Sequence, residues 1–298
     1  MGSPGRAPSR VVPLPDLEFA RVPDTIVDGF SLRDAGLTEQ VRVRAVSLRG
    51  LSHRCYGRVR QDTYDWRVTA DDRYLVVCVA DGVSAGRLSH LAADQAGVFG
   101  TRLLCEQLAD TAPAELRWDE LLDATAEAIL GVGAAFVAPK AAVGTEAARW
   151  EIAEHMATTV LYAVVDLVPA DGRHDVTLLT VGDTSAWVLG TDGRWRAQQP
   201  IKNEGDEIYS PAVVALPILP SVASRPVRTG VAPGEALVLM TDGVGDPLGD
   251  GTGAVADFLA ESWREPPADL EFAAQAGFSR RSFDDDRTVF ALWPVGRS

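Results

Sequence analysis

The sequence predicts an α+β fold built from layers of helices and mainly antiparallel β-sheets. Strand-like segments occur in closely spaced series with short turns between them, which is typical of antiparallel pairing. Two blocks of helical periodicity, at residues 87–155 and 254–278, interrupt these series, so helices and strands are segregated along the chain. An acid-rich turn and one further apolar strand, at residues 284–293, end the pattern.

The N-terminal half divides into an extension and the first part of a domain. Residues 1–44 are Pro-rich and then weakly periodic, so we assign them to an extension that is partly disordered or docks on a domain at 45–298. Alternating polar and apolar residues predict the first strand at 39–50. Two strands about a turn at Asp71-Asp72 follow, and helical spacing then predicts helices at 87–110, 113–137 and 145–155.

The C-terminal half returns to strands. Turn signals separate a series of short strands at 158–167, 174–183, 185–190 and 194–198. Residues 200–230 contain five prolines and little periodicity, and we interpret them as a surface excursion. A strand at 235–240 and helices at 254–263 and 268–278 precede the final strand.

Charge and cysteine content narrow the classes of partner and compartment. The net charge of −14 argues against a nucleic-acid partner, because phosphate binding needs a basic surface, and it suits cation binding by clustered acids. The three cysteines form no CxxC pair, which indicates a reducing compartment and argues against a disulfide framework or a zinc site. Because the sequence has neither an 18-residue apolar run nor the apolar core of a signal peptide, we expect a cytoplasmic protein with no membrane partner.

Two of the six Asp-Gly pairs are not explained by hairpin turns. Asp171-Gly172 and Asp192-Gly193 lie between strands a few residues apart, as hairpin turns do, and two further pairs lie in irregular polar surroundings. Asp81-Gly82 and Asp242-Gly243 instead each end a strongly apolar strand that no second strand follows. A carboxylate at the mouth of a buried strand loses hydration, which is tolerated mainly when a cation or hydrogen bonds compensate for the loss.

Three further acids, Asp62, Asp183 and Asp285, lie at strand boundaries in distant parts of the chain. Strand-edge aspartates can converge on one end of a sheet sandwich, and an all-oxygen cluster of this kind suits Mg²⁺ or Mn²⁺ rather than zinc. The four histidines include no pair at ligand spacing. The residues by themselves leave two interpretations open, a metal cluster or a scatter of turns and caps.

The motifs resemble, in their order, those of the metal-dependent protein phosphatases of the PPM family, the type 2C serine/threonine phosphatases. They are GLSHRCYGRVRQD at 50–62, VVCVADGVSAGRLSHLAADQA at 76–96, ATTVLYAVV at 157–165, LLTVGDTSAWVL at 178–189, LVLMTDGVGDPL at 237–248 and DDDRT at 284–288. The first is similar to the opening of a bacterial branch with a Gly-x-Ser-His start and a Gln-Asp end, and the last to a terminal Asp-Asn-x-Thr motif. Each motif alone is weak, but six in family order, spread over most of the chain, are specific.

The resemblance implies a central sandwich of two mainly antiparallel sheets with helices on both sides, and a flap at 200–230 in a catalytic domain at 45–298. It also implies two Mn²⁺ or Mg²⁺ ions that share a water, which as hydroxide attacks the phosphorus of the substrate. The positions carried over are Asp81 with the carbonyl of Gly82 between the two ions, Asp242 and Asp285 at the first ion, Asp62 at metal-bound water or at a metal, and Asp183 and Asp246 at a third ion found in many members.

Among the departures from the family pattern, three bear on metal binding, phosphate binding and proton donation. Gln61 stands where the usual opening has Glu, so it offers a metal one neutral oxygen. Gly57 stands where many members have a phosphate-binding Arg; Arg58 or Arg60 could substitute because a guanidinium suits phosphate, and ordinary surface charge is the alternative. Val83 stands where animal members often have a proton-donating His, so water would protonate the leaving group.

The function that the resemblance implies is hydrolysis of phosphoserine and phosphothreonine on protein substrates, opposing a bacterial serine/threonine kinase. Two alternatives remain at this point, a pseudophosphatase that serves as a protein-interaction module and a phosphatase for a small phosphoester. A module has no need of four buried acids, which favours an enzyme.

Overall fold

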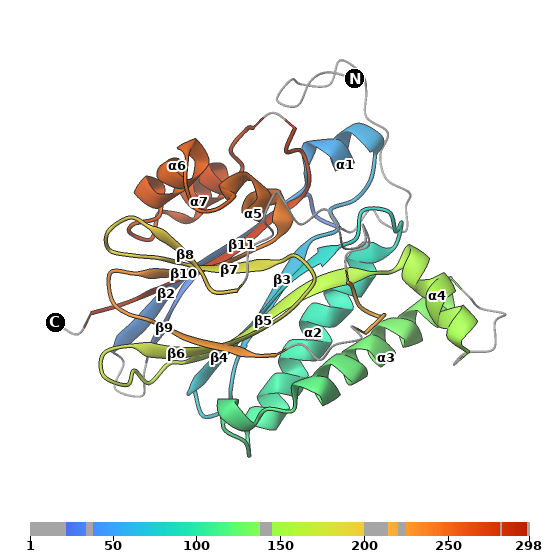
Figure 1. Ribbon diagram of the computed structural model, residues 1–298, viewed down its shortest axis with the longest axis horizontal. Coiled ribbons are helices and arrows are strands. Elements are labelled where there is room, and N and C mark those ends of the chain that lie inside the picture. The colour runs from blue at the N-terminus through green and yellow to red at the C-terminus, as the bar shows by residue number, and fades with distance from the viewer. Residues whose placement is uncertain are drawn as a thin grey trace.

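The structure is a computed structural model, and it describes residues 22–33, 38–137, 145–199, 214–219, 225–280 and 282–296. Within these residues two antiparallel sheets face each other, and helices cover both outer sides (Figure 1). The α+β sandwich predicted from the sequence is therefore confirmed.

Both sheets are antiparallel throughout their described pairings. The six-stranded sheet has the order β1 (Thr25–Arg33), β2 (Glu39–Leu48), β11 (Arg287–Pro294), β10 (Ala236–Met240), β7 (Ser185–Leu189) and β8 (Trp195–Ala197). The five-stranded sheet has the order β3 (Thr63–Val68), β4 (Tyr74–Gly82), β5 (Thr158–Asp166), β6 (His174–Val181) and β9 (Val227–Val231).

Helices from two parts of the chain cover the two sheets (Figure 1). The five-stranded sheet is covered by α2 (Ser89–Leu108) and α3 (Trp118–Phe136). A short 3₁₀ turn, Pro113–Glu115, lies between these two helices, and α4 (Glu146–His155) lies beside α3. The six-stranded sheet is covered by α5 (Asp242–Leu248), α6 (Ala254–Ser262) and α7 (Asp269–Ala276). The short helix α1 (Leu51–Tyr56) lies in the link from β2 to β3.

Strand alternation divides the core into three layers. On β4, the even-numbered residues 74–80 pack against the helices, whereas the odd-numbered residues 75–79 fill the space between the sheets. On β10, Leu237 and Leu239 likewise point between the sheets, and Val238 and Met240 point toward α5–α7. This alternation fixes the direction of the next residue along each strand, which matters for the site.

The first strand of the six-stranded sheet lies in the segment that sequence analysis assigns to the N-terminal extension. β1 pairs with β2 from Thr25 to Arg33, and the boundary expected after residue 44 falls inside β2. β1 is an edge strand with one exposed side, so its sequence alternates weakly and gives little signal. Residues 1–21 lie outside the described residues.

The segment at 200–230 contributes to the sandwich at two points, although residues 200–213 and 220–224 lie outside the described residues. Leu216 is fully buried and forms two backbone hydrogen bonds of 2.9 Å with Thr158 at the start of β5. β9, at the end of the segment, pairs with β6. These described parts differ from a surface excursion, because paired backbone allows a segment with little periodicity to be buried.

Candidate metal centre

Asp62, Asp81, Asp242 and Asp285 lie at the same end of the sandwich. Asp62 precedes β3 and Asp81 lies near the end of its antiparallel neighbour β4, so these positions meet at one sheet end. Asp242 follows β10 and Asp285 precedes β11, and they meet for the same reason. The alternation on β4 points Asp81 into the space between the sheets. Each sheet therefore presents two acids to the other.

The side chains of Asp62, Asp81 and Asp242 lie close together. Asp62 is buried, and its Oδ2 accepts a 2.7 Å hydrogen bond from the Thr241 hydroxyl. Burial raises the pKa of Asp62 well above its usual value, and the nearby charges of Asp286, Asp242 and Asp285 act in the same direction. Burial likewise raises the pKa of Asp81, with further increases from the charges of Asp62 and Asp242. Such groups are stabilised as carboxylates only if a cation compensates for their repulsion.

Asp242 lies near Asp81 and also near the more exposed acids Asp183, Asp246 and Asp285. Burial raises its pKa to about 6, although its hydrogen bond with Asp81 lowers it in part. The charges of Asp183, Asp285 and Asp246 also reach Asp242 and contribute to this raised pKa. Asp183 and Asp285 are half-buried and Asp246 is exposed. The structure thus brings together all six acids that sequence analysis singles out.

The two arginines considered for phosphate binding have different surroundings. Arg60 is buried, and its guanidinium donates to Pro23 O (3.1 Å), to Ser47 Oγ (2.6 Å) and to Asp62 O. This arginine therefore supports the backbone beneath Asp62, in contrast to the phosphate contact considered from the sequence. Arg58 is exposed and donates to Ser84 O at 2.8 Å, in the loop that follows Asp81-Gly82.

The donor set fits a hard divalent cation. None of the ion pairs formed by the described residues includes Asp62, Asp81 or Asp242. Gln61 adds a neutral oxygen: its Nε2 donates to Gly86 O at 2.6 Å, whereas its Oε1 is buried and has no hydrogen-bond partner among the described residues. Carboxylate and amide oxygens are the ligands that Mg²⁺ and Mn²⁺ prefer.

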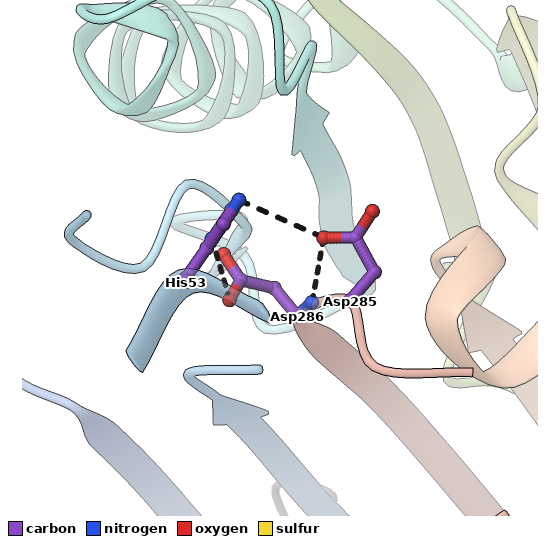
Figure 2. A group of neighbouring side chains, drawn as sticks. All are labelled: His53, Asp285 and Asp286. Carbon is purple, nitrogen blue, oxygen red and sulfur yellow. Dashed lines mark hydrogen bonds and ion pairs between the residues drawn. The ribbon is translucent and has the colours of Figure 1, made fainter. Parts of the chain in front are cut away.

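His53 and Asp286 form a buried ion pair beside this cluster (Figure 2). His53 Nδ1 lies 2.9 Å from Asp286 Oδ1, and its Nε2 lies 3.8 Å from Asp285 Oδ1. Burial by itself lowers the pKa of His53, but the hydrogen bond to Asp286 and the charges of Asp286 and Asp285 outweigh it, so the pKa is raised. This geometry gives His53 a structural role, because it contacts a buried carboxylate. One ligand atom from each of the three residues lies within 4.8 Å of the others, yet both Asp286 oxygens accept N–H donors.

Sequence reasoning missed two residues of this site, Asp286 and Thr241. Asp286 is one of three successive acids, and nothing in the sequence distinguishes the buried one. Thr241 is fully buried; its hydroxyl donates to Asp62 and also accepts a 3.0 Å hydrogen bond from Thr288 N. A threonine directly before an Asp-Gly pair at a strand end is the signal that could have found it.

The glycines after the strand-end acids allow backbone segments to approach closely. A Cβ at Gly82 would lie 2.7 Å from Gln61 O, and one at Gly243 would collide with Asp286 O. Both obstacles are backbone atoms, which cannot rotate away as a side chain can. Glycine at these two positions therefore lets the strand ends that carry the acids pack closely against neighbouring backbone.

Gly243→Ala should destabilise the fold by about 1–3 kcal/mol, the usual cost of overpacking, because the new methyl group must displace Asp286. Thermal unfolding of the metal-free protein measures this loss. The matched control is Gly131→Ala in α3, where a Cβ meets no atom within 4 Å and should stabilise the helix by about 0.5–1 kcal/mol. Equal melting temperatures for the two variants would contradict the assigned contact.

A cavity of about 290 Å³ opens beside Asp285. Its walls combine apolar side chains, among them Leu51, Phe278 and Phe283, with the charged side chains of Arg54 and Asp284. The cavity therefore extends from Asp285 to α1.

Comparison with known proteins identifies the family. A family model described as protein phosphatase 2C matches residues 49–271. The chain belongs to the protein phosphatase 2C family. This is a family of metal-dependent serine/threonine phosphatases. No curated protein matches the sequence of this family member.

Solved structures of the protein phosphatase 2C fold superpose over most of the chain. RsbX in complex with magnesium is 13% identical, with 91% of this chain and 100% of that chain covered and a TM-score of 0.53. The phosphatase domain of SpoIIE from Bacillus subtilis, with a fragment of its regulatory domain, is 13% identical, with coverages of 92% and 71% and a TM-score of 0.52. The catalytic domain of the phosphatase PstP with two manganese ions is 18% identical, with coverages of 86% and 99% and a TM-score of 0.51. At 13–18% identity, these superpositions show that the chain shares the fold of these proteins.

Among the described residues of this protein phosphatase 2C family member, no helix has the length and apolar character needed to cross a membrane.

Proposed function

We propose that this chain is an active phosphatase that hydrolyses phosphoserine and phosphothreonine on protein substrates with the help of two Mn²⁺ or Mg²⁺ ions. The observation that supports this most strongly is the group of four aspartates drawn from both sheets, three of them with carboxyl pKa values raised by burial and mutual repulsion. Such a group suits bound divalent cations, which lower the pKa of coordinated water and neutralise charge on phosphoryl oxygens.

The residues of this chain would bind the metal ions, position a ligand and bind phosphate. Asp62, Asp81, Asp242 and Asp285 would hold the two ions, with the carbonyl of Gly82 and the free oxygen of Gln61 as neutral ligands and Asp183 and Asp246 at a third ion. Thr241 orients Asp62 through its 2.7 Å hydrogen bond. Arg58 would bind the phosphoryl group, because its guanidinium is exposed and is held by the Ser84 carbonyl in the loop after Asp81-Gly82.

Hydrolysis adds water to phosphorus and breaks the bond from phosphorus to the serine or threonine oxygen. That oxygen must gain a proton. Val83 follows Asp81-Gly82 and cannot donate one, so the proton comes from solvent water. The products are inorganic phosphate and the free hydroxyl side chain.

A protein substrate is favoured over a small phosphoester by the cavity beside Asp285. Its apolar wall lies next to the acid cluster and gives a substrate side chain a place to bind beyond the phosphoryl group. The cognate partner would be a serine/threonine kinase that phosphorylates the same protein, in the cytoplasm.

Hydrolysis of p-nitrophenyl phosphate should appear with Mn²⁺ or Mg²⁺ and vanish with EDTA, because the acids need bound cations to act. A phosphoserine peptide should compete with this reaction, and the unphosphorylated peptide is the control. Metal-dependent hydrolysis without peptide competition would favour a small phosphoester as substrate. Silence with both metals would favour a non-catalytic interaction module, with Gln61 and Gly57 as the departures responsible.

A further inference from the structure

The Asp286 carboxylate receives hydrogen bonds from two segments of the chain that are distant from it in sequence. Its side chain is 1% exposed. Oδ1 accepts from Gly50 N at 2.6 Å and lies 2.9 Å from His53 Nδ1, at the start of α1 and within it. Oδ2 accepts from Gln61 N at 2.5 Å and from Asp62 N at 3.4 Å, just before β3. Figure 2 shows Asp286 between His53 and Asp285.

This arrangement ties the two sheets together directly beneath the acid cluster. Asp286 immediately precedes β11 in the six-stranded sheet, whereas Asp62 immediately precedes β3 in the five-stranded sheet. On the same side, the Asp286 N–H donates to Asp285 Oδ1 at 2.9 Å. A displacement of Asp286 would therefore shift Asp62 through its backbone and Asp285 through its carboxylate.

We propose that Asp286 is a positioning residue that sets the separation of Asp62 and Asp285, with His53 in contact with it. This inference rests on the proposed metal site but assigns Asp286 no contact with metal or substrate. Both of its oxygens are occupied by protein donors, so it acts only through the residues that it holds.

A carboxylate is required here because every partner of Asp286 is a donor. An asparagine offers one acceptor oxygen, and its NH₂ group would face either the Gly50 N–H or the Gln61 N–H, whichever oxygen position it takes. The terminal motif of the family pattern has Asn at this position, and this chain has Asp286 in its place. His53 Nδ1 lies 2.9 Å from this buried carboxylate, so the two side chains form one structural unit.

Asp286→Asn should weaken Mn²⁺ binding by about 10- to 100-fold, the usual loss when a group supporting a metal ligand is removed. Free Mn²⁺ is measured by its electron paramagnetic resonance signal during titration of the protein, which does not depend on catalysis. Thermal unfolding in EDTA reports the fold separately. The matched control is Asp175→Asn, the same change at an exposed acid on β6; its Mn²⁺ affinity should stay close to that of the unaltered protein.

A second pair of variants keeps the test decisive if Asp286→Asn does not fold. His53→Gln retains an N–H donor for Asp286 and should bind Mn²⁺ more tightly than His53→Ala, which retains none. Unchanged Mn²⁺ affinity in Asp286→Asn, or in both His53 variants, would overturn the positioning role while leaving the metal site intact. If the unaltered protein bound no Mn²⁺, the proposed function itself would fail. If it bound Mn²⁺ but hydrolysed no phosphoester, only the activity would fail.

Discussion

Asp81→Asn and Asp242→Asn should each abolish phosphoester hydrolysis while the protein remains folded. Each variant removes one of the four carboxylates proposed to hold the ions. Loss of a group that only supports a ligand costs about 10- to 100-fold in affinity or activity, so loss of a ligand itself should exceed about 100-fold. Without metal, the same change removes one of several mutually repelling carboxyls, and burial already opposes the charged form of both residues.

Initial rates at saturating Mn²⁺ and melting temperatures in EDTA measure the two effects. The melting temperatures should equal or exceed that of the unaltered protein. Asp175→Asn is the matched control, because Asp175 is an exposed acid on β6, away from the cluster, and should leave both quantities unchanged. If either cluster variant kept more than a few per cent of the activity, the assignment of that residue would be wrong.

In the absence of metal, Asp242 should make the stability of the fold decrease as pH rises from about 4 to about 6. Burial raises its pKa from 3.8 to about 6, so over this window the folded protein holds a proton that the unfolded chain has released. The stabilisation is therefore complete below about 4 and is lost as pH rises through about 6. The difference between the two pKa values corresponds to about 3 kcal/mol.

The pH dependence must be measured as a difference between the unaltered protein and Asp242→Asn. Burial and then the charge of Arg60 lower the pKa of His90 to about 4. Its contribution to the stability of the fold therefore has the opposite pH dependence, because it is lost as pH falls. Its contribution is common to both proteins and cancels on subtraction. Chemical denaturation in EDTA at several pH values gives the difference, which should decrease toward neutral pH.

Addition of Mn²⁺ should reverse the sign, because the cation binds the deprotonated acids and stabilises the folded state more as pH rises. A difference that stays constant with pH in EDTA would show that Asp242 titrates normally.

The convergence of the acids could be predicted from the sequence because it follows from strand ends. Asp81 and Asp242 each end an apolar strand, and in an antiparallel sandwich the ends of such strands and the starts of their neighbours share an edge. The alternation that places Val79 between the sheets also places Asp81 there. For these residues, local pattern and fold class are enough.

Other features depend on contacts that no local pattern contains. α1 spans six residues, too few for helical periodicity to be recognised. Asp284, Asp285 and Asp286 are identical in type, and only the packing of β11 against α1 and β3 decides that Asp286 is the buried one. Arg60 resembled a phosphate ligand because its sequence position does not reveal that three protein oxygens surround its guanidinium.

The origin of the acids in two different sheets has a consequence for the cohesion of the molecule. In the part of the chain that the structure describes, the sheets share no hydrogen-bonded ladder, and between them lies an apolar core. Ions held by Asp62 and Asp81 on one side and by Asp242 and Asp285 on the other would join the sheets where that core ends. Exchange of backbone amides with solvent would then slow in both sheets together when ions bind, rather than in one loop. The supply of divalent ions would thereby govern how long the folded chain survives as well as how fast it works.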